Sequence, residues 1–314
     1  MLRLFRLAVA IALTAYILWL AHPAEVVRSA AGADWRWIFT AVALVLVDRT
    51  LMAYRWMVLL CALTPGSRPP FLAVLRIFFV STFVGTFLPS LGGDLYRAYS
   101  LARMRVSGAE AGASVLMDRT LGVLSIVIVG AVAVLLAHEV LANRWTLTAL
   151  LIAAAGCTVA ALAVFSERAA AAAQTLASRL PHARVRRMSA ALIDAVRRYS
   201  LHHAELTNVL VMSVIVQIIR VLQAYALGRA LGLAVPLPLY FAFIPVIVLI
   251  MQIPIAPSGI GTSQAAFLVL FGTAGVASAD AVALSILFVA LGIVGNLPGA
   301  ILYASGRRPA PQNT

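Results

Sequence analysis

The stretch FLPSLGGDLYRAY, residues Phe87 to Tyr99, breaks an apolar run with a proline and two glycines and then resumes with an aspartate and an arginine. The run before it, residues 71–88, corresponds to about 27 Å of helix, which is almost enough to cross the ~30 Å hydrocarbon core of a bilayer. A second break, IAPSGIGTSQ at Ile255 to Gln264, divides another apolar run near the other end of the chain. We interpret the two breaks as two halves of one site.

The composition of the chain is that of a membrane protein. Among its 314 residues, 63% are hydrophobic and only 11% are charged, whereas soluble domains carry about 25% charged residues. Several apolar runs reach roughly 18 or more residues, the length of a membrane-spanning helix. We therefore predict an all-α polytopic membrane protein in which residues 1–314 form a single transmembrane domain.

The positive charge of the chain is carried by arginine. The formal net charge is +13, and all 24 basic residues are arginines; a codon bias explains the absence of lysine as well as a function does. Arginine keeps its charge when buried and binds phosphate and carboxylate through a planar fork of donors. Such a chain suits anionic lipid surfaces. Because the arginines are dispersed among apolar runs and form no single basic face, we expect no nucleic-acid partner.

The sequence offers no pattern typical of a metal site or of an enzyme. Cys61 and Cys157 lie in separate apolar segments, without a second cysteine or a histidine at metal-binding spacing. We find no nucleophile–base pair and no phosphate-binding loop of the Walker type. We therefore expect no metal, no cofactor and no catalytic residue.

Eight membrane segments are expected. Full spans are predicted at about residues 4–21, 37–62, 109–137, 146–165, 206–232 and 281–304. Two further segments, residues 71–104 and 238–275, each contain one break. Each break is either a re-entrant hairpin or an ordinary loop between two short spans, and in residues 238–275 both arms are long enough to be spans. The chain returns to its starting face in either case.

The distribution of arginines predicts the orientation of this arrangement. Fourteen arginines fall on the side of the N-terminus and four on the other side, so the positive-inside rule predicts that both termini are cytoplasmic. The two halves, residues 1–137 and 146–304, then have the same order of segments in opposite orientation, which is an inverted-topology repeat. Residues 4–21 resemble a secretory signal peptide, but the spans that follow favour a retained first helix.

The connector between the two halves, residues 166–205, is basic. Within it, residues 182–200 carry apolar residues at helical spacing opposite five arginines. This pattern is typical of a helix that lies on an anionic cytoplasmic leaflet, and it also fits a solvated connector.

Charged residues within apolar spans require a reason, because each costs roughly 2.5–3.5 kcal/mol on membrane insertion. Asp48 lies mid-span with Arg49 and Arg55 in the same segment, and we favour a neutralising pair that only holds helices together. Asp118 and Arg119 form a second pair of neighbours, for which a structural and a functional role are equally supported.

Arg220 is the most informative of the buried charges. It lies in VQIIRVLQAY, within a predicted span that contains no acidic residue, so it needs an acid from another element, such as Asp94, or an anionic ligand. Asp94 also lies three residues before Arg97 on the same helical face, and it cannot neutralise both arginines. We therefore expect at least one of Arg97 and Arg220 to face a polar cavity between the two broken segments and to contact the head group of a substrate.

The glycines at the breaks expose backbone N–H groups. Gly92–Gly93 precedes a helix from Asp94, and Gly259–Gly261 precedes a helix from Thr262. Together with the positive end of a helix dipole, such groups can cradle an anion. The candidate substrate-binding residues are Arg76, Pro89, Ser90, Gly92, Gly93, Asp94, Arg97, Asp118, Arg119, Arg220, Pro257, Ser258, Gly259, Gly261 and Gln264.

Three motifs resemble those of a known family. FLPSLGGDLYRAYSLAR, SVLMDRTLG and PSGIG before a helix are similar to motifs of the lysylphosphatidylglycerol synthase transmembrane region, a flippase-like domain that also occurs as stand-alone bacterial and archaeal proteins. The likeness covers nearly the whole chain, and its most specific part is the Pro-x-x-Gly-Gly-Asp-x-x-Arg run from Pro89 to Arg97. The family usually has a glutamate where this chain has Gln264. A role that needs a carboxylate at this position, such as holding a cationic head group or carrying a proton, therefore does not follow from the resemblance.

The resemblance implies lipid translocation and not lipid synthesis. Aminoacyl-transferring members carry an additional soluble domain, and we expect this chain, which ends at Thr314, to act without one. We predict a transporter or flippase of the bacterial inner membrane for an amphiphile with an anionic or phosphate-bearing head group, such as an anionic phospholipid, a polyprenyl phosphate or a hopanoid-like lipid.

Two other functions remain open on the sequence. One is a non-transporting accessory subunit of a lipid-modifying enzyme or glycosyltransferase, because no residue pattern for energy coupling is present. The other is a transporter of a small soluble anion. Whether the protein works as a homodimer or with an enzyme partner is also left open.

Overall fold

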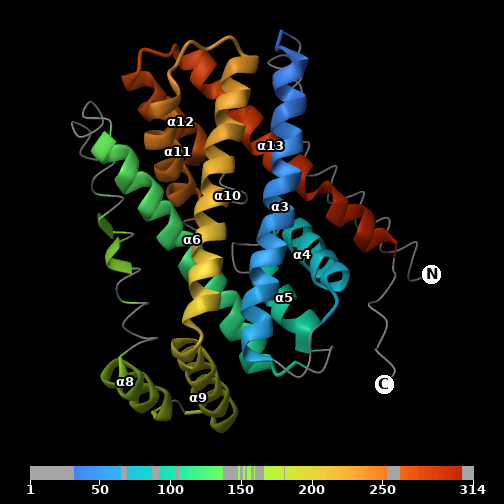
Figure 1. Ribbon diagram of the computed structural model, residues 1–314, viewed down its shortest axis with the longest axis vertical. Coiled ribbons are helices and arrows are strands. Elements are labelled where there is room, and N and C mark those ends of the chain that lie inside the picture. Colours follow the sequence, from blue (N-terminus) through green and yellow to red (C-terminus); the bar gives the residue numbers. More distant parts are fainter. Residues whose placement is uncertain are drawn as a thin grey trace.

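The computed structural model describes residues 32–64, 69–86, 92–102, 106–136, 166–179, 181–252 and 262–305, together with residues 148, 151, 152, 154–156 and 159. Every regular element in the long ranges is a helix (Figure 1). In chain order these are α3 (Trp35–Leu63), α4 (Phe71–Gly85), α5 (Gly92–Ala102), α6 (Gly108–Leu136), α8 (Glu167–Ser178), α9 (Ala183–Arg198), the short 3₁₀ helix η2 (Tyr199–Leu201), α10 (His203–Ala230), α11 (Leu237–Gln252), α12 (Thr262–Thr273) and α13 (Ser278–Ala304). The prediction of an all-α chain is confirmed for these ranges.

Four of the described helices, α3, α6, α10 and α13, are long and apolar enough to cross a membrane. They coincide with four predicted spans, at residues 37–62, 109–137, 206–232 and 281–304. The predicted span at residues 4–21 lies outside the described residues, as does most of the one at residues 146–165. The total number of spans and the inverted repeat therefore stay predictions.

Each broken segment contains a pair of shorter helices. α4 and α5 flank the first break and α11 and α12 flank the second, while residues 87–91 and 253–261 themselves lie outside the described residues. α11 has 16 residues and α12 has 12, whereas about 20 are needed to cross a bilayer. Because residues 253–261 lie outside the described residues, the prediction that both arms of the second segment are long enough to be spans stays a prediction.

The centre of the molecule is formed by α3 and α10, which lie side by side and run in opposite directions (Figure 1). The side chain of Asp34 accepts a hydrogen bond from the backbone N–H of Arg36 and caps the start of α3. The backbone N–H of Asp34 donates to the carbonyl of Ala230 at 3.0 Å, which joins the start of α3 to the end of α10. At the opposite end α3 ends, α6 and α10 begin, and α8 and α9 lie beside them (Figure 1).

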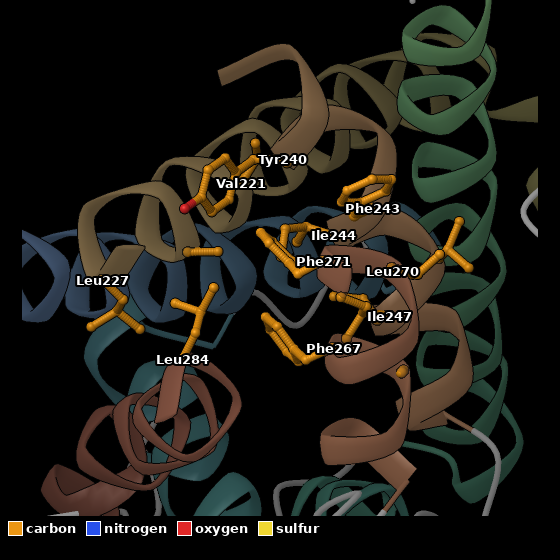
Figure 2. Close-up of a cluster of buried hydrophobic side chains, with 14 of the residues drawn as sticks. Val221, Leu227, Tyr240, Phe243, Ile244, Ile247, Phe267, Leu270, Phe271 and Leu284 are labelled. Carbon is orange, nitrogen blue, oxygen red and sulfur yellow. The ribbon is translucent and has the colours of Figure 1, made fainter. Parts of the chain in front are cut away.

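The largest apolar core lies among α10, α11, α12 and α13 (Figure 2). Phe267 stacks on Phe271 with ring centroids 5.4 Å apart, and Tyr240 meets the edge of Phe271 at 5.1 Å. Buried aromatic contacts of this kind add to the free energy of area burial. The core therefore holds the two helices of the second broken segment against the long helices.

Two glycines allow the first broken segment to pack closely. A Cβ atom on Gly93 would lie 2.8 Å from the carbonyl oxygen of Ser81, so α5 folds back directly onto α4. A Cβ atom on Gly299 would overlap the carbonyl oxygen of Phe79, so α13 lies directly against α4. Only glycine permits these backbone approaches, and they fix the hairpin of α4 and α5 beside the long helices.

The predicted amphipathic helix of the connector is present as α9. At its C-terminal side Val196 and Tyr199 are buried, and the Tyr199 hydroxyl donates to the Leu59 carbonyl at 2.8 Å. Burial raises the pKa of Tyr199 well above its usual value, so the hydroxyl remains a donor. At the other side Val185 and Met188 are 49% and 64% exposed. The C-terminal part of the apolar face of α9 therefore packs against the protein, and its N-terminal part is exposed.

Candidate functional site

A cavity of about 360 Å³ lies inside the bundle, with a wall formed by α3, α4, α5, α6, α10, α11 and α13. The described residues that flank the two breaks belong to this wall, with Thr86 and Gly93 on either side of the first break and Gln252 before the second. The charged residues of the wall are Asp48, Arg49, Asp94, Arg97, Arg119 and Arg220. Described residues next to two breaks that are far apart in the sequence thus border one charged cavity.

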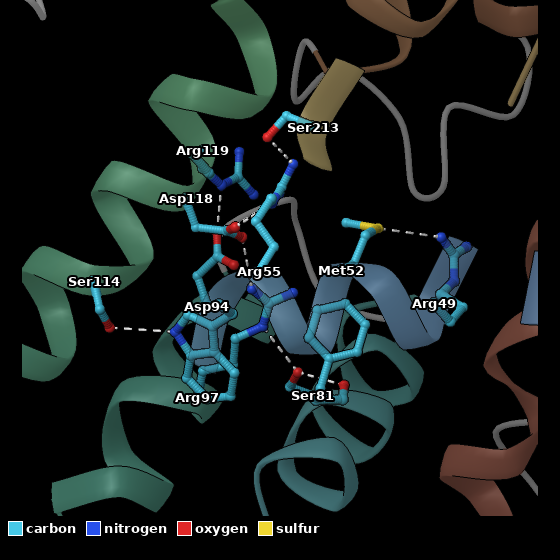
Figure 3. A network of polar contacts seen from close by, with 12 residues as sticks. Arg49, Met52, Arg55, Ser81, Asp94, Arg97, Ser114, Asp118, Arg119 and Ser213 are labelled. Atoms are coloured by element: carbon cyan, nitrogen blue, oxygen red, sulfur yellow. Dashed lines mark hydrogen bonds and ion pairs between the residues drawn. The ribbon is translucent and has the colours of Figure 1, made fainter. Parts of the chain in front are cut away.

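Asp118 ties three long helices together behind the cavity (Figure 3). Its carboxylate accepts from Arg55 Nε at 2.7 Å and pairs with Arg97 Nη1 at 3.4 Å. The other end of the Arg55 guanidinium donates to Ser213 Oγ of α10 at 2.9 Å. All four side chains are buried, so the single carboxylate of Asp118 is shared by two buried cations.

Arg97 extends from α5 into a pocket of aromatic and polar groups. Its Nε donates to Ser81 Oγ of α4 at 3.1 Å. Its guanidinium lies 4.4 Å from the ring centroid of Phe78 and 5.4 Å from that of Trp56, within the range of cation–π attraction. These contacts hold the guanidinium in one orientation at the wall of the cavity (Figure 3).

Asp94 pairs with Arg119 of α6 through the Nε of that arginine (Figure 3). The sequence had predicted that Asp94 pairs with Arg97 or with Arg220, but Arg97 pairs with Asp118 and Arg220 with Asp48. The ion pairs of Asp94 and Arg97 therefore each join α5 to α6, which a pair within one helix would not do. Arg119 remains 36% exposed in its side chain.

Asp48 of α3 is the acid that Arg220 was predicted to need. Its Oδ2 lies 2.8 Å from Arg49 Nη1, and its Oδ1 lies 3.3 Å from Arg220 Nε. One carboxylate is therefore shared by two arginines from different helices. The Nη2 of Arg220 donates to the sulfur of Met52 at 3.1 Å, and a thioether is a weak acceptor. Arg220 is thus weakly held compared with Arg55 and its short bond to Asp118.

Asn296 of α13 connects the Asp48 group to the first broken segment. Its amide oxygen accepts from Arg49 Nε at 3.0 Å, and its amide nitrogen donates to Thr86 Oγ1 at 2.9 Å. Thr86 is the last described residue before the first break. The polar chain therefore runs from the centre of α3 to the end of α4.

Gln223 lies one helical turn beyond Arg220 in α10 and also lines the cavity. Its side chain is buried, with 4% of the residue exposed. Within the described part of the chain, its Nε2 has no hydrogen-bond partner, and neither has Asp48 Oδ1, because the nearby Arg220 Nε is not aligned as a donor. An unpaired buried donor costs about 1–3 kcal/mol, so an amide at this position calls for an acceptor.

The charges around the cavity do not balance. The charged residues that form ion pairs at or behind the cavity wall are Arg49, Arg55, Arg97, Arg119, Arg220, Asp48, Asp94 and Asp118. Five arginines face three aspartates, which leaves two positive charges in excess. The sequence of both breaks, residues 87–91 and 253–261, contains no charged residue. This site favours an anion.

Some predicted residues lie away from the cavity. Arg76 donates to the carbonyl of Leu302 at 3.2 Å and to Ser305 Oγ at 3.4 Å, near the end of α13. Gln264 lies on α12, outside the described lining, and Gly92 is the first residue of α5. The candidates outside the described residues are Pro89, Ser90, Pro257, Ser258, Gly259 and Gly261.

The structure brings Gly93, Asp94, Arg97, Arg119 and Arg220 together at the cavity, as the sequence had predicted for residues of one site. Asp118 lies behind them as a shared counter-ion. Both Arg97 and Arg220 line the polar cavity, in agreement with the expectation that at least one of them would.

Residues of this wall that were not among the candidates include Arg49, Asp48, Gln223 and Asn296. The first two had been read as a structural pair. The amides carried a signal of their own, because a buried amide within an apolar span needs a partner. Gln223 in particular follows Arg220 by three residues, which places both on one face of α10.

Metal binding has no support within the described residues, where no three His, Cys, Asp or Glu side chains are placed to hold an ion. The absence of a metal, a cofactor and a catalytic residue stays a prediction for the whole chain.

Comparison with protein families gives one match. The family described as the lysylphosphatidylglycerol synthase TM region matches residues 4–299, which is nearly the whole chain. No curated protein matches the sequence.

Proposed function

The chain belongs to the lysylphosphatidylglycerol synthase transmembrane region family, and from this membership we propose that it transports a lipid across the bacterial inner membrane. The substrate is an amphiphile with an anionic or phosphate-bearing head group. An anionic phospholipid, a polyprenyl phosphate and a hopanoid-like lipid with such a head group all meet this description. The protein performs no covalent chemistry, and both of its termini are cytoplasmic.

The observation that carries the proposal is the excess of positive charge around a cavity inside apolar helices. Five arginines and three aspartates carry the charge, and among the described residues the partners of Arg220 are a shared carboxylate and a thioether. A charge that is buried without compensation is expensive. An anionic head group that enters the cavity supplies the missing negative charge.

A lipid fits this site better than a fully enclosed solute for two reasons. The family is associated with lipid biology, and the cavity of about 360 Å³ is of the size of small-ligand sites, roughly 300–1,000 Å³. A lipid head group fits into such a volume, whereas acyl chains of ordinary length are too large for it. In this proposal the head group occupies the cavity and its chains stay in the surrounding bilayer.

The proposal is tested with purified protein in liposomes. Phosphatidylglycerol with a fluorescent label on one chain is added to the membrane, and movement between leaflets is followed by chemical quenching from outside. We expect wild-type protein to accelerate this movement over protein-free liposomes. Arg220→Gln should slow it roughly tenfold or more, because a charged bidentate contact is lost.

The matched control is Arg229→Gln on the same helix. Arg229 lies in the last turn of α10 with its guanidinium 5.8 Å from the ring of Trp37, and it is not part of the cavity wall. This variant should move lipid at the wild-type rate. Failure of wild-type protein to move any phosphate-bearing lipid would favour the accessory-subunit function, and equal rates for Arg220→Gln and Arg229→Gln at equal stability would remove the argument for an anionic head group.

A further inference from the structure

Two neighbouring side chains of α10 present hydrogen-bond donors to the cavity. Arg220 and Gln223 are three residues apart, so they lie on one face of the helix, and both line the wall. Within the described residues Gln223 Nε2 has no acceptor, although the residue is only 4% exposed. The pair therefore consists of one permanently charged guanidinium and one amide donor without an acceptor among the described residues.

Asp48 supplies the negative charge beside Arg220 in the unliganded protein. Its Oδ1 lies 3.3 Å from Arg220 Nε without hydrogen-bond alignment, whereas its Oδ2 holds Arg49 at 2.8 Å. The contact with Arg220 is the longer and poorer of the two. Asp48 can therefore give up Arg220 and still keep Arg49 as its counter-ion.

We propose that Arg220 and Gln223 form a phosphate-binding subsite, and that Asp48 is an internal counter-ion which the phosphate displaces from Arg220. The proposal rests on the lipid-transport function above and specifies the recognition element of its head group. One phosphate oxygen accepts from the guanidinium of Arg220, and a second accepts from Gln223 Nε2. Phosphate suits this arrangement because it offers several acceptor oxygens, and arginine binds it in a bidentate manner.

The charge balance supports displacement over simple addition. Before binding, the carboxylate of Asp48 is shared by Arg49 and Arg220. After binding, Arg49 has Asp48 to itself and Arg220 has the phosphate, so each of the two cations has its own anion. The excess of two positive charges falls to one with a phosphate diester and to none with a dianionic monoester.

This mechanism predicts opposite changes in affinity for two substitutions, one of which removes a donor and the other a negative charge. Gln223→Met keeps the length of the side chain and removes the donor, so phosphate should bind about tenfold more weakly, as expected for one hydrogen bond to a charged group. Asp48→Asn removes the carboxylate that competes with phosphate for Arg220. Phosphate should therefore bind about tenfold more tightly, a change equivalent to a shift of one unit in a pKa.

The stability of the free protein should change in the reverse order. Gln223→Met removes a buried amide without a partner, so the melting temperature without ligand should stay the same or rise. Asp48→Asn leaves Arg49 and Arg220 without their shared counter-ion, so the melting temperature without ligand should fall. A purely structural role of these residues does not produce weaker binding in the more stable variant and tighter binding in the less stable one.

The experiment measures binding by isothermal titration calorimetry, with full-length protein in a neutral detergent. The probes are dihexanoylphosphatidylglycerol and inorganic phosphate, and the proteins are wild type, Gln223→Met, Asp48→Asn and the control Arg229→Gln. The opposite shifts with the lipid probe identify a lipid phosphate as the ligand, and the same shifts with inorganic phosphate alone identify a soluble one. Either supports the subsite. Affinities within twofold of wild type for both variants with both probes overturn it.

The result is distinguishable from failure of the transport function. If the opposite shifts are found while liposomes show no lipid movement, the subsite stands and transport does not. If lipid movement is intact and the affinities do not shift, transport stands and the assignment of Arg220, Gln223 and Asp48 is wrong.

Discussion

At the scale of single residues, the buried aspartates of this protein differ in how firmly they hold their arginines. Asp118 is fully occupied by Arg55 and Arg97 at buried positions. Asp48 forms ion pairs with both Arg49 and Arg220, and its Oδ1 accepts no aligned hydrogen bond from the described residues. A carboxylate with two good partners stabilises the fold, whereas one with a poor second partner leaves a cation available to a ligand.

Asp118→Asn should strongly destabilise the protein. The substitution keeps the shape of the side chain but leaves Arg55 and Arg97 buried without a counter-charge, which costs about 3–5 kcal/mol for a broken buried pair. Thermal unfolding in detergent measures the effect. Asp194→Asn is the control, because Asp194 lies on α9 in an exposed contact with Gln174, and its loss should leave the melting temperature nearly unchanged. Equal melting temperatures for the two variants would contradict this account of Asp118.

At the scale of elements, close helix contacts depend on two glycines, of which the sequence analysis had singled out Gly93 for anion binding but not Gly299. Gly299 lies in α13 against the backbone of α4, and Gly93 lies in α5 against Ser81 of α4. Both contacts position the first broken segment beside the cavity. The packing of this segment is therefore fixed by backbone approach as well as by its ion pairs.

Gly299→Ala should separate α13 from α4. The added Cβ atom overlaps the carbonyl of Phe79, which the backbone can relieve only by moving, and overpacking of this kind costs about 1–3 kcal/mol. Gly292→Ala on the same helix is the matched control, since nothing lies within 4 Å of a Cβ atom there, and alanine gains up to about 1 kcal/mol of helix propensity. Thermal unfolding should therefore shift in opposite directions, and a shift in the same direction would count against the proposed contact.

The exposed part of α9 should lie in the membrane interface. Val185 and Met188 are exposed at the N-terminal side of a helix with several arginines, a combination that favours an anionic lipid surface. A nitroxide at Met188→Cys, in a background without Cys61 and Cys157, should be more accessible to dissolved oxygen than to a water-soluble relaxation agent in anionic nanodiscs. The same label at Arg186→Cys should show the reverse preference. Equal behaviour at both positions would favour a solvated connector.

At the scale of the whole molecule, the sequence predicted the long helices because apolar length alone identifies them, as at residues 206–232. It also predicted both breaks from proline and glycine. It could not predict which acid meets which base. Asp94 meets Arg119 in place of Arg97, and Arg220 meets an aspartate 172 positions earlier, because these choices depend on the rotation and depth of packed helices. Cavity residues on several helices emerge only from that packing.

The last prediction concerns the orientation of the molecule in the membrane. α3 ends, and α6 and α10 begin, at the end of the molecule where α8 and α9 lie (Figure 1). Seven arginines of residues 166–205 gather at this end, whereas the described arginines at the opposite end of α3 and α10 are Arg36 and Arg229. The positive-inside rule assigns the arginine-rich end to the cytoplasm.

Fusions of a fluorescent protein and of alkaline phosphatase test this orientation in cells. Fusions at either terminus should fluoresce and lack phosphatase activity, because both termini are predicted on the side of residues 166–205. An alkaline phosphatase inserted after Gly275, in the turn between α12 and α13, should be active, because that turn is predicted on the opposite face. Phosphatase activity at either terminus would contradict the assignment, and with it the inverted order of the two halves, since that order requires an even number of crossings between the N-terminus and the C-terminus.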